Sequence, residues 1–175
     1  AKNAETFGIE LDMKKSLDFI GLRGLSLVCN AAYIHSRVRF EEGAPERDRP
    51  LAGQSPYLVN AGLFYQHDDK RISASLLYNR IGKRIESVGV PMQDQNEDIP
   101  DIYEMPRNSL DLTFSKKIGK AVEIKAGIQD MLNSKIEYKQ FVKLTDQNGG
   151  KREREQLVRS YRPGVDINVG VSLKF

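Results

Sequence analysis

The last eleven residues of the chain alternate between apolar and polar side chains, and this pattern restricts the possible folds more than any other feature. The apolar set is Val165, Ile167, Val169, Val171, Leu173 and Phe175. The set between them is Asp166, Asn168, Gly170, Ser172 and Lys174. Alternation with a period of two is typical of a β-strand that has one apolar and one polar face. Eleven residues exceed the usual strand length of about five or six and match the roughly 9–11 residues with which a tilted strand crosses a bilayer.

Six earlier segments show the same alternation, and no segment has the periodicity of an amphipathic helix. The segments are 6–13, 25–33, 57–66, 72–79, 110–115 and 123–129. The sequence therefore predicts an all-β fold of about seven antiparallel strands, with no domain boundary within residues 1–175.

The connections between these segments alternate in length. Short ones are expected near 18–24, 67–70 and 118–120, and long ones at 41–55, 90–107 and 139–163. Short turns on one side and long loops on the other are typical of an outer-membrane β-barrel. A water-soluble β-sandwich also alternates, but it rarely combines such long strands with loops that are long on one side only. The pattern favours the transmembrane barrel, with the sandwich as the alternative.

Composition excludes several other classes. No apolar run approaches the roughly 18 residues of a membrane-spanning helix, and 27 basic against 24 acidic residues argue against a nucleic-acid-binding protein. The single cysteine, Cys29, excludes a disulfide framework within the chain.

The first strand is expected to begin on the long-loop side, and bacterial barrels have even strand numbers. We therefore expect the chain to be the C-terminal portion of a larger barrel.

Four stretches, taken in order, resemble the C-terminal barrel region of TonB-dependent outer-membrane receptors of the Bacteroidetes type. They are residues 5–11 (ETFGIEL), 54–65 (QSPYLVNAGLFY), 127–133 (GIQDMLN) and 160–164 (SYRPG). The third departs from the family pattern, because DMLN stands where the family has N-L-F-D.

This resemblance implies a 22-stranded barrel in the bacterial outer membrane, of which this chain supplies about seven strands, with the plug domain outside the chain. It implies uptake of a scarce, bulky nutrient such as a siderophore, cobalamin, glycan or peptide. Implied partners are membrane lipid, the TonB complex acting through the plug, and a surface lipoprotein. No cofactor, catalytic activity or nucleic acid is expected. The alternatives are a passive outer-membrane channel or adhesin barrel, and a soluble all-β binding module.

The end of the chain also resembles the assembly signal of outer-membrane barrels, a polar residue, a glycine, a hydrophobic residue and a terminal aromatic at fixed spacing. Asn168, Gly170, Leu173 and Phe175 occupy these positions. Such an edge strand is suited to pairing with the barrel assembly machinery by strand addition. An ordinary terminal edge strand is the alternative.

Few residues suggest catalytic or metal chemistry. His35 and His67 lie on different predicted strands without metal-ligand spacing, and Cys29 on an apolar face indicates a small hydrophobic residue rather than a nucleophile. An acidic loop could bind Ca²⁺ through its carboxylate oxygens, or it is simply a loop exposed to solvent. Its acidic residues are Asp94, Glu97, Asp98, Asp101 and Glu104.

Two further sets of polar residues are candidates for binding. A basic loop suits an anionic ligand, or neutralises itself through Glu153 and Glu155; it holds Lys151, Arg152, Arg154, Arg159 and Arg162. Polar residues on the strands are expected to face the barrel lumen, and these are Glu10, Asp12, Asn60, Asn79, Asp111, Glu123, Lys125 and Asp166.

Overall fold

The structure is a computed structural model of the chain, and it describes residues 1–90, 99–145 and 151–173. Over these residues the chain forms eleven β-strands and one short 3-10 helix, with no α-helix. Every strand pair is antiparallel. The predicted all-β class is confirmed. In the described part of the chain, no helix is long and apolar enough to cross a membrane.

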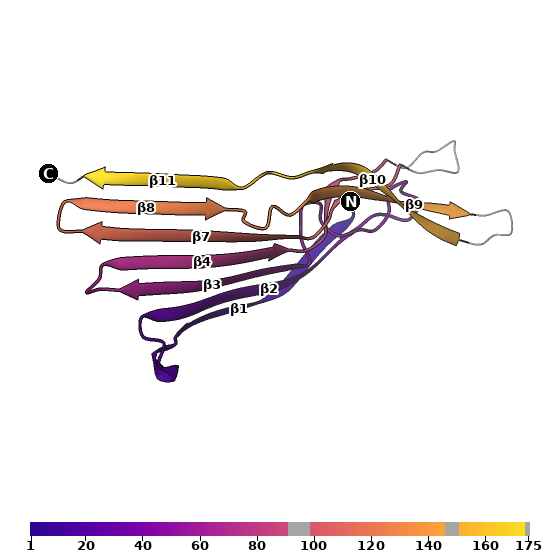
Figure 1. Cartoon of the computed structure of the whole chain (residues 1–175). Helices are drawn as coiled ribbons and strands as arrows, with labels where there is room; N and C mark the ends of the chain where they lie inside the picture. The colour runs from indigo at the N-terminus through magenta and orange to yellow at the C-terminus, as the bar shows by residue number, and fades with distance from the viewer. Residues whose placement is uncertain (91–98, 146–150, 174–175) are drawn as a thin grey trace.

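Seven strands form one large sheet in the order β1-β2-β3-β4-β7-β8-β11 (Figure 1). Their bounds are β1 Asn3–Ser16, β2 Leu25–Arg39, β3 Tyr57–His67, β4 Ile72–Ile81, β7 Arg107–Ile118, β8 Val122–Gln129 and β11 Asp166–Leu173. Six of these strands contain the alternating segments between residues 6 and 129, and β11 covers residues 166–173 of the last segment. The sheet is open, because β1 and β11 are its edges.

The expected total of seven strands is wrong, because four more strands form a second sheet in the order β10-β9-β6-β5. Their bounds are β5 Arg84–Ser87, β6 Ile102–Glu104, β9 Ile136–Thr145 and β10 Lys151–Tyr161. β6 and β10 lie within the expected long loops at 90–107 and 139–163, whereas β9 begins before the second of these loops and β5 precedes the first. β6 has only three residues, and the β10 sequence KREREQ places charges on both faces. Neither segment therefore shows an apolar period of two.

The register of the large sheet places the apolar residues of neighbouring strands on one face. On one side of the sheet, Leu11 of β1 pairs with Ala31 of β2, and Ala31 pairs with Val59 of β3. In the middle of the sheet Leu63 pairs with Leu76, and Leu76 pairs with Leu112. The same row continues from Leu112 to Ile128 and from Ile128 to Ile167 of β11. Because directly paired residues point to the same side, the apolar face is continuous across all seven strands.

The short connections lie together at one end of the large sheet. The first contains the 3-10 helix η1 (Asp18–Ile20), and the others are the turns between β3 and β4 and between β7 and β8. Gly24 enters β2 with φ +75°, and its carbonyl accepts the amide of Gln66. A Cβ at Gly24 would lie 2.2 Å from the carbonyl oxygen of Gln66, so glycine is required there.

The few buried side chains lie at the opposite end, where the long connections cover the sheet. Among the described residues they are Val38, Ile85 and Tyr138, together with Ser36 and Ser55. Leu51 donates its amide to Ser36 Oγ, and Gly53 donates its amide to the carbonyl of Ile85. The second sheet is thus packed against the loop ends of the large sheet, while the large sheet itself remains a single layer (Figure 1).

Candidate functional site

The apolar face of the large sheet is exposed to a degree unusual for a folded protein. On the edge strands, Ile9 is 76% and Val169 is 72% exposed, and Phe7, Leu11 and Ile167 are similar. Inner strands contribute the half-buried Leu76 and Leu112 on the same face. Contiguous apolar patches beyond a few hundred Å² mark an interaction surface for protein or membrane.

Polar residues border this apolar band at both ends. Along β2 the apolar run extends from Leu25 to Tyr33, which at about 3.3 Å per residue is about 30 Å of strand. At a strand tilt of 35–45° this corresponds to roughly 21–25 Å, close to the apolar height of outer-membrane barrels. Beyond the run lie His35 and Arg37 at the loop end. Lys15 in β1 and Lys116 in β7 lie at the turn end.

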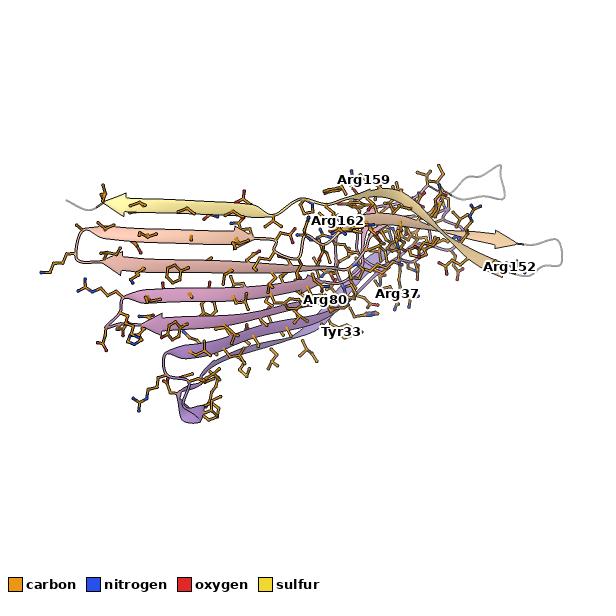
Figure 2. The ribbon with its side chains drawn as sticks, viewed as in Figure 1. Tyr33, Arg37, Arg80, Arg152, Arg159 and Arg162 are labelled. Atoms are coloured by element: carbon orange, nitrogen blue, oxygen red, sulfur yellow. The ribbon has the colours of Figure 1, made fainter. Side chains whose placement is uncertain are left out.

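Arg80 of β4 stands at the loop-end border and links three strands. Its Nε donates to the Tyr57 hydroxyl of β3 at 3.3 Å, and its Nη1 donates to Asn108 Oδ1 of β7 at 2.7 Å. The Tyr78 hydroxyl donates to the same Asn108 oxygen at 2.8 Å. Tyr33 lies directly opposite Tyr57 in the sheet, so aromatic rings and one guanidinium together mark the border (Figure 2).

The neighbouring arginines at this end each contact a carboxylate. Arg37 pairs with Asp48 at 2.9 Å, Arg39 with Glu5 at 2.9 Å, and Arg107 with Asp130 at 3.2 Å. Arg80 contacts only neutral groups among the described residues.

The opposite face of the sheet carries a ladder of amides. Asn79 Nδ2 donates to Asn60 Oδ1, and Asn60 Nδ2 donates to Asn30 Oδ1 at 3.3 Å. Asn30 Nδ2 then donates to Glu10 Oε1 at 2.9 Å and to Asp12 Oδ1 at 2.6 Å. Every amide donates towards the two carboxylates of β1, an alignment in which each bond polarises the next.

The polar character of this face continues across β4, β7 and β8. Ser75 Oγ lies 2.6 Å from Thr113 Oγ1. Ser115 donates to Glu123, which also contacts Lys125 at 3.4 Å. Six of the eight predicted lumen residues are therefore joined in polar contacts on their own face. Asp166 is exposed at the start of β11.

Asp111, the remaining member of that set, anchors a strained turn after β8. Asp111 Oδ1 accepts the backbone amide of Asp130 at 2.8 Å. Asp130 and Asn133 both have positive φ, +51° and +44°. Asn133 in turn accepts the amide of Gly164 at 3.1 Å and a guanidinium bond from Arg162. This turn holds the start of β11 beside β8.

An aromatic cage joins the second sheet to the large one. Lys83, in the link after β4, places Nζ 4.1 Å from the centre of the Tyr103 ring and 3.6 Å from that of Phe141. Burial lowers the pKa of the Lys83 ammonium, against the opposing charges of Glu153 and Glu155. Burial also raises the pKa of Tyr103, aided by Asp101. Next to the cage, Arg84 pairs with Glu104 at 2.7 Å.

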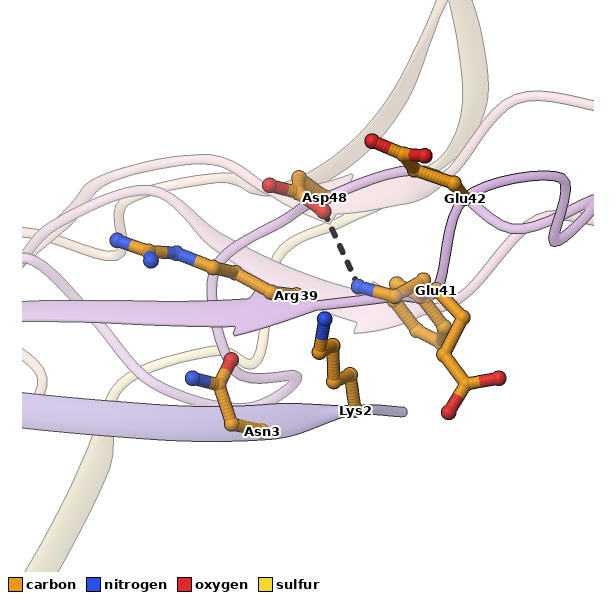
Figure 3. A pocket seen from close by; sticks show the side chains of 7 residues that line it. Lys2, Asn3, Arg39, Glu41, Glu42 and Asp48 are labelled. Atoms are coloured by element: carbon orange, nitrogen blue, oxygen red, sulfur yellow. Dashed lines mark hydrogen bonds between the residues drawn. The ribbon is translucent and has the colours of Figure 1, made fainter.

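Open cavities lie near the two opposite ends of the large sheet. The first, of about 520 Å³, is lined by Lys2, Asn3, Arg39, Phe40, Glu41, Glu42 and Asp48 (Figure 3). The amide of Phe40 and the guanidinium of Arg37 hold the pKa of Asp48 below its usual range. The second, of about 820 Å³, lies among the turns after β3 and β7 and includes Arg71, Lys117 and Lys120. Charges of both signs line each cavity, so neither one selects a ligand by charge.

The described part of the predicted assembly signal lies on β11, while Phe175 lies outside the described residues. Leu173 is 61% exposed on the apolar face. Asn168 faces the other side, where its side chain lies over Gly127: a Cβ on that glycine would be 2.8 Å from Asn168 Oδ1. Gly170 has no neighbour where its Cβ would be.

The structure does not bring together the residues that were considered for catalysis or metal binding. His35 stacks against Phe7 with ring centres 5.2 Å apart, and His67 contacts Tyr65 at the turn end. Cys29 is half-buried on the apolar face, opposite Met13 and Ala61. Within the described ranges, no three His, Cys, Asp or Glu side chains are grouped as metal ligands would be.

The residues of the predicted acidic and basic loops do not form a cluster in the part of the chain that the structure describes. Asp94, Glu97 and Asp98 lie outside the described residues. Asp101 accepts the amide of Gly89, and Glu104 is held by Arg84. The basic loop is in fact strand β10 and its exit. The side chain of Lys151 lies outside the described residues, Arg152 and Arg154 are exposed, and Arg159 stacks on Tyr138 at 4.1 Å.

Three features of this region were not expected from the sequence: the Asn30 rung of the ladder, the Arg80 cluster and the Lys83 cage. Each joins side chains from different strands, so each depends on register. The sequence does contain one indication of the ladder, because Asn30, Asn60 and Asn79 all occupy polar positions of their alternating segments.

No family model, curated protein or solved structure matches this chain. The resemblance to TonB-dependent receptors therefore stays a prediction, and the architecture described above is what supports a function.

Proposed function

We propose that the large sheet is part of the wall of a transmembrane β-barrel in a bacterial outer membrane. We further propose that this barrel is a TonB-dependent transporter for a scarce, bulky nutrient. The observation that carries the first proposal is the apolar face, which is continuous in register over seven strands and is exposed.

Lipid is the partner that best fits this face. In water the face would expose large side chains such as Phe7, Ile9 and Leu11 at about 25 cal/mol per Å² of apolar area. The band has about the height of the apolar belt of outer-membrane barrels, and charged residues appear at its two borders rather than in its middle. A lysine or arginine at the bilayer midplane costs roughly 2–4 kcal/mol, and much less near the interfaces.

The polar face suits the inside of such a barrel. Its ladder of asparagines and carboxylates, and its Ser75–Thr113 and Ser115–Glu123 pairs, satisfy polar groups without excluding water. In the proposal, further strands pair with the free edges of β1 and β11, and the barrel assembly machinery inserts the chain through β11. The second sheet stands at the side of the long connections, where a surface lipoprotein would meet it.

Active uptake rests on the four stretches that resemble the receptor family. The TonB complex would act through a plug domain, so the polar face of this sheet would contact the plug. A passive channel or adhesin barrel would have the same wall, and energy dependence separates the two.

Two neighbouring alanines of β2 test the membrane wall. Ala31 lies opposite Leu11 on the apolar face, and Ala32 lies opposite Glu10 on the polar face. With Cys29→Ala as background, Ala31→Cys and Ala32→Cys each carry one thiol-linked fluorophore in phosphatidylcholine vesicles. We expect lipids brominated on the acyl chain to quench the label at 31 strongly and the label at 32 weakly. Aqueous iodide should give the reverse order.

Equal quenching of both labels by iodide would exclude the membrane wall. So would a detergent-free monomer that unfolds cooperatively in water, which would instead support the soluble binding module.

Uptake by cells tests the transport proposal. Cells with and without the protein receive a labelled ferric siderophore, cobalamin, oligosaccharide or peptide, each with and without a proton ionophore. A TonB-dependent transporter should accumulate one class of nutrient, and the ionophore should abolish that accumulation. Entry that the ionophore leaves unchanged would identify a passive channel.

A further inference from the structure

We propose that the cluster of Arg80, Tyr57, Tyr78 and Asn108 binds the phosphate headgroup of a membrane lipid. The cluster lies at the loop-end border of the apolar band, on the face that we propose contacts lipid. This inference rests on that proposed membrane wall and adds a specific lipid site to it.

The hydrogen bonds within the cluster leave several donors unused. Asn108 Oδ1 accepts from Arg80 Nη1 and from the Tyr78 hydroxyl, so both of its lone pairs are engaged. The Tyr57 oxygen accepts from Arg80 Nε, which leaves the hydroxyl proton free. Arg80 has five N–H groups and uses two of them here. The remaining donors are three N–H groups of Arg80, the Tyr57 hydroxyl and the amide of Asn108.

The charge of the cluster points to an anion. The arginines at the loop ends of β2 and β7 are each neutralised by a carboxylate, from Asp48, Glu5 or Asp130. Arg80 has no such partner among the described residues, and its contacts are an amide and a phenol. A positive, donor-rich cluster requires a ligand with several acceptor oxygens, and the fork of a guanidinium matches phosphate.

The position of the cluster points to a lipid rather than to a free anion. Arg80 lies two residues beyond Tyr78 along β4, about 7 Å further towards the loops, and Tyr78 lies opposite the apolar Leu110. Leu76 and Leu112 follow on the same face. A lipid whose acyl chains lie along these leucines would bring its phosphate to the level of Arg80.

The rings help to hold the guanidinium at this level. Tyr33 and Tyr57 are directly opposite each other, and Tyr57 bonds Arg80. Tyrosines at a membrane interface have an apolar body in the band and a polar end at the headgroups. Arg80 is thereby held against the sheet by Tyr57 and Asn108, and its side chain remains partly exposed; Figure 2 labels its position.

The test measures lipid retention by native mass spectrometry of the detergent-extracted protein. The probes are phosphatidic acid, diacylglycerol with the same acyl chains, and inorganic phosphate. The wild type should retain phosphatidic acid, release diacylglycerol, and keep its lipid in the presence of excess inorganic phosphate. Arg80→Gln should weaken the retention of phosphatidic acid at least about tenfold, since it removes a charge-assisted, forked contact.

Two further variants control for folding and for general charge. Asn108→Asp keeps Arg80 in place but supplies a carboxylate that competes for it, so retention should fall as in Arg80→Gln. Arg152→Gln removes one positive charge from the exposed strand β10, away from the band, and should leave retention unchanged.

Three results would overturn the inference: equal retention by Arg80→Gln and the wild type, equal loss in Arg152→Gln, or displacement of the lipid by inorganic phosphate. Failure of the membrane wall gives a different result, because the labels at positions 31 and 32 then fail to distinguish lipid from water. If those labels behave as expected while Arg80→Gln still retains lipid, only the lipid site is wrong.

Discussion

The ammonium of Lys83 lies 3.6 Å from the centre of the Phe141 ring, although the two residues are 58 positions apart in the chain. Lys83 follows β4 of the large sheet, and Phe141 belongs to β9 of the second sheet. The ammonium also lies 4.1 Å from the centre of the Tyr103 ring, so this lysine connects the two sheets at the point where the chain passes from one to the other.

Replacing Lys83 should therefore loosen the second sheet while leaving the large sheet intact. Lys83→Met keeps the length of the side chain but loses two cation–π contacts, worth about 1–2 kcal/mol together. We expect faster amide hydrogen exchange in β6 and β9 and unchanged exchange in β3 and β4. Lys83→Arg keeps a cation over the rings and should restore protection. Equal exchange in Lys83→Met and the wild type would contradict a role for the cage.

Breaking the asparagine ladder should destabilise the large sheet itself. Asn60 both donates to Asn30 and accepts from Asn79. Asn60→Leu leaves one acceptor and one donor without a partner, at about 1–3 kcal/mol for each group that stays dry. The melting temperature in detergent should fall clearly. Ser75→Ala, which removes one hydroxyl contact on the same face, should lower it less. A melting temperature unchanged by Asn60→Leu would show that water replaces the ladder.

The sequence was sufficient for the large sheet because each of its strands satisfies a simple rule. Residues such as Leu11, Ala31 and Val59 had to share a face once their segments alternated, and neighbouring segments joined by short turns had to pair. The facing of the seven strands, and the three pairs β1–β2, β3–β4 and β7–β8, follow from that rule alone.

This rule does not predict the register between strands, nor the structure of the long connections. Nothing local to Arg80 shows that Asn108 lies opposite it, because residues 82–106, with β5 and β6, come between them. The charged strand β10 has no apolar period, since it pairs with β9 away from the large sheet. The Arg80 cluster and the Lys83 cage both depend on such pairings, and this is why neither was predicted.

Acidification should release the turn between β1 and β2. Asp18 accepts from the Ser16 hydroxyl at 2.7 Å and from the Gly24 amide at 2.9 Å. These bonds hold the pKa of Asp18 below its ordinary value of 3.8. Because the folded-state pKa is the lower one, the stabilisation is complete above about pH 4 and disappears as the pH falls through the folded pKa.

The amide nitrogen chemical shift of Gly24 measures this release directly. It should titrate below pH 3.8 in the wild type, and it should be flat over the same range in Asp18→Asn, which has no carboxyl group to protonate. A Gly24 shift that titrates equally in both proteins would assign the effect to another group.

The last strand should control assembly more than binding. Leu173 is exposed on the apolar face of β11, and the sequence places Phe175 two positions further along the same alternation. Phe175→Ala should reduce the amount of heat-modifiable barrel in outer membranes several-fold, because it removes the terminal aromatic of the proposed assembly signal. Ser172→Ala, a change on the polar face of the same strand, should leave that amount unchanged. If both variants assemble at the wild-type level, β11 is an ordinary edge strand and the assembly signal is wrong.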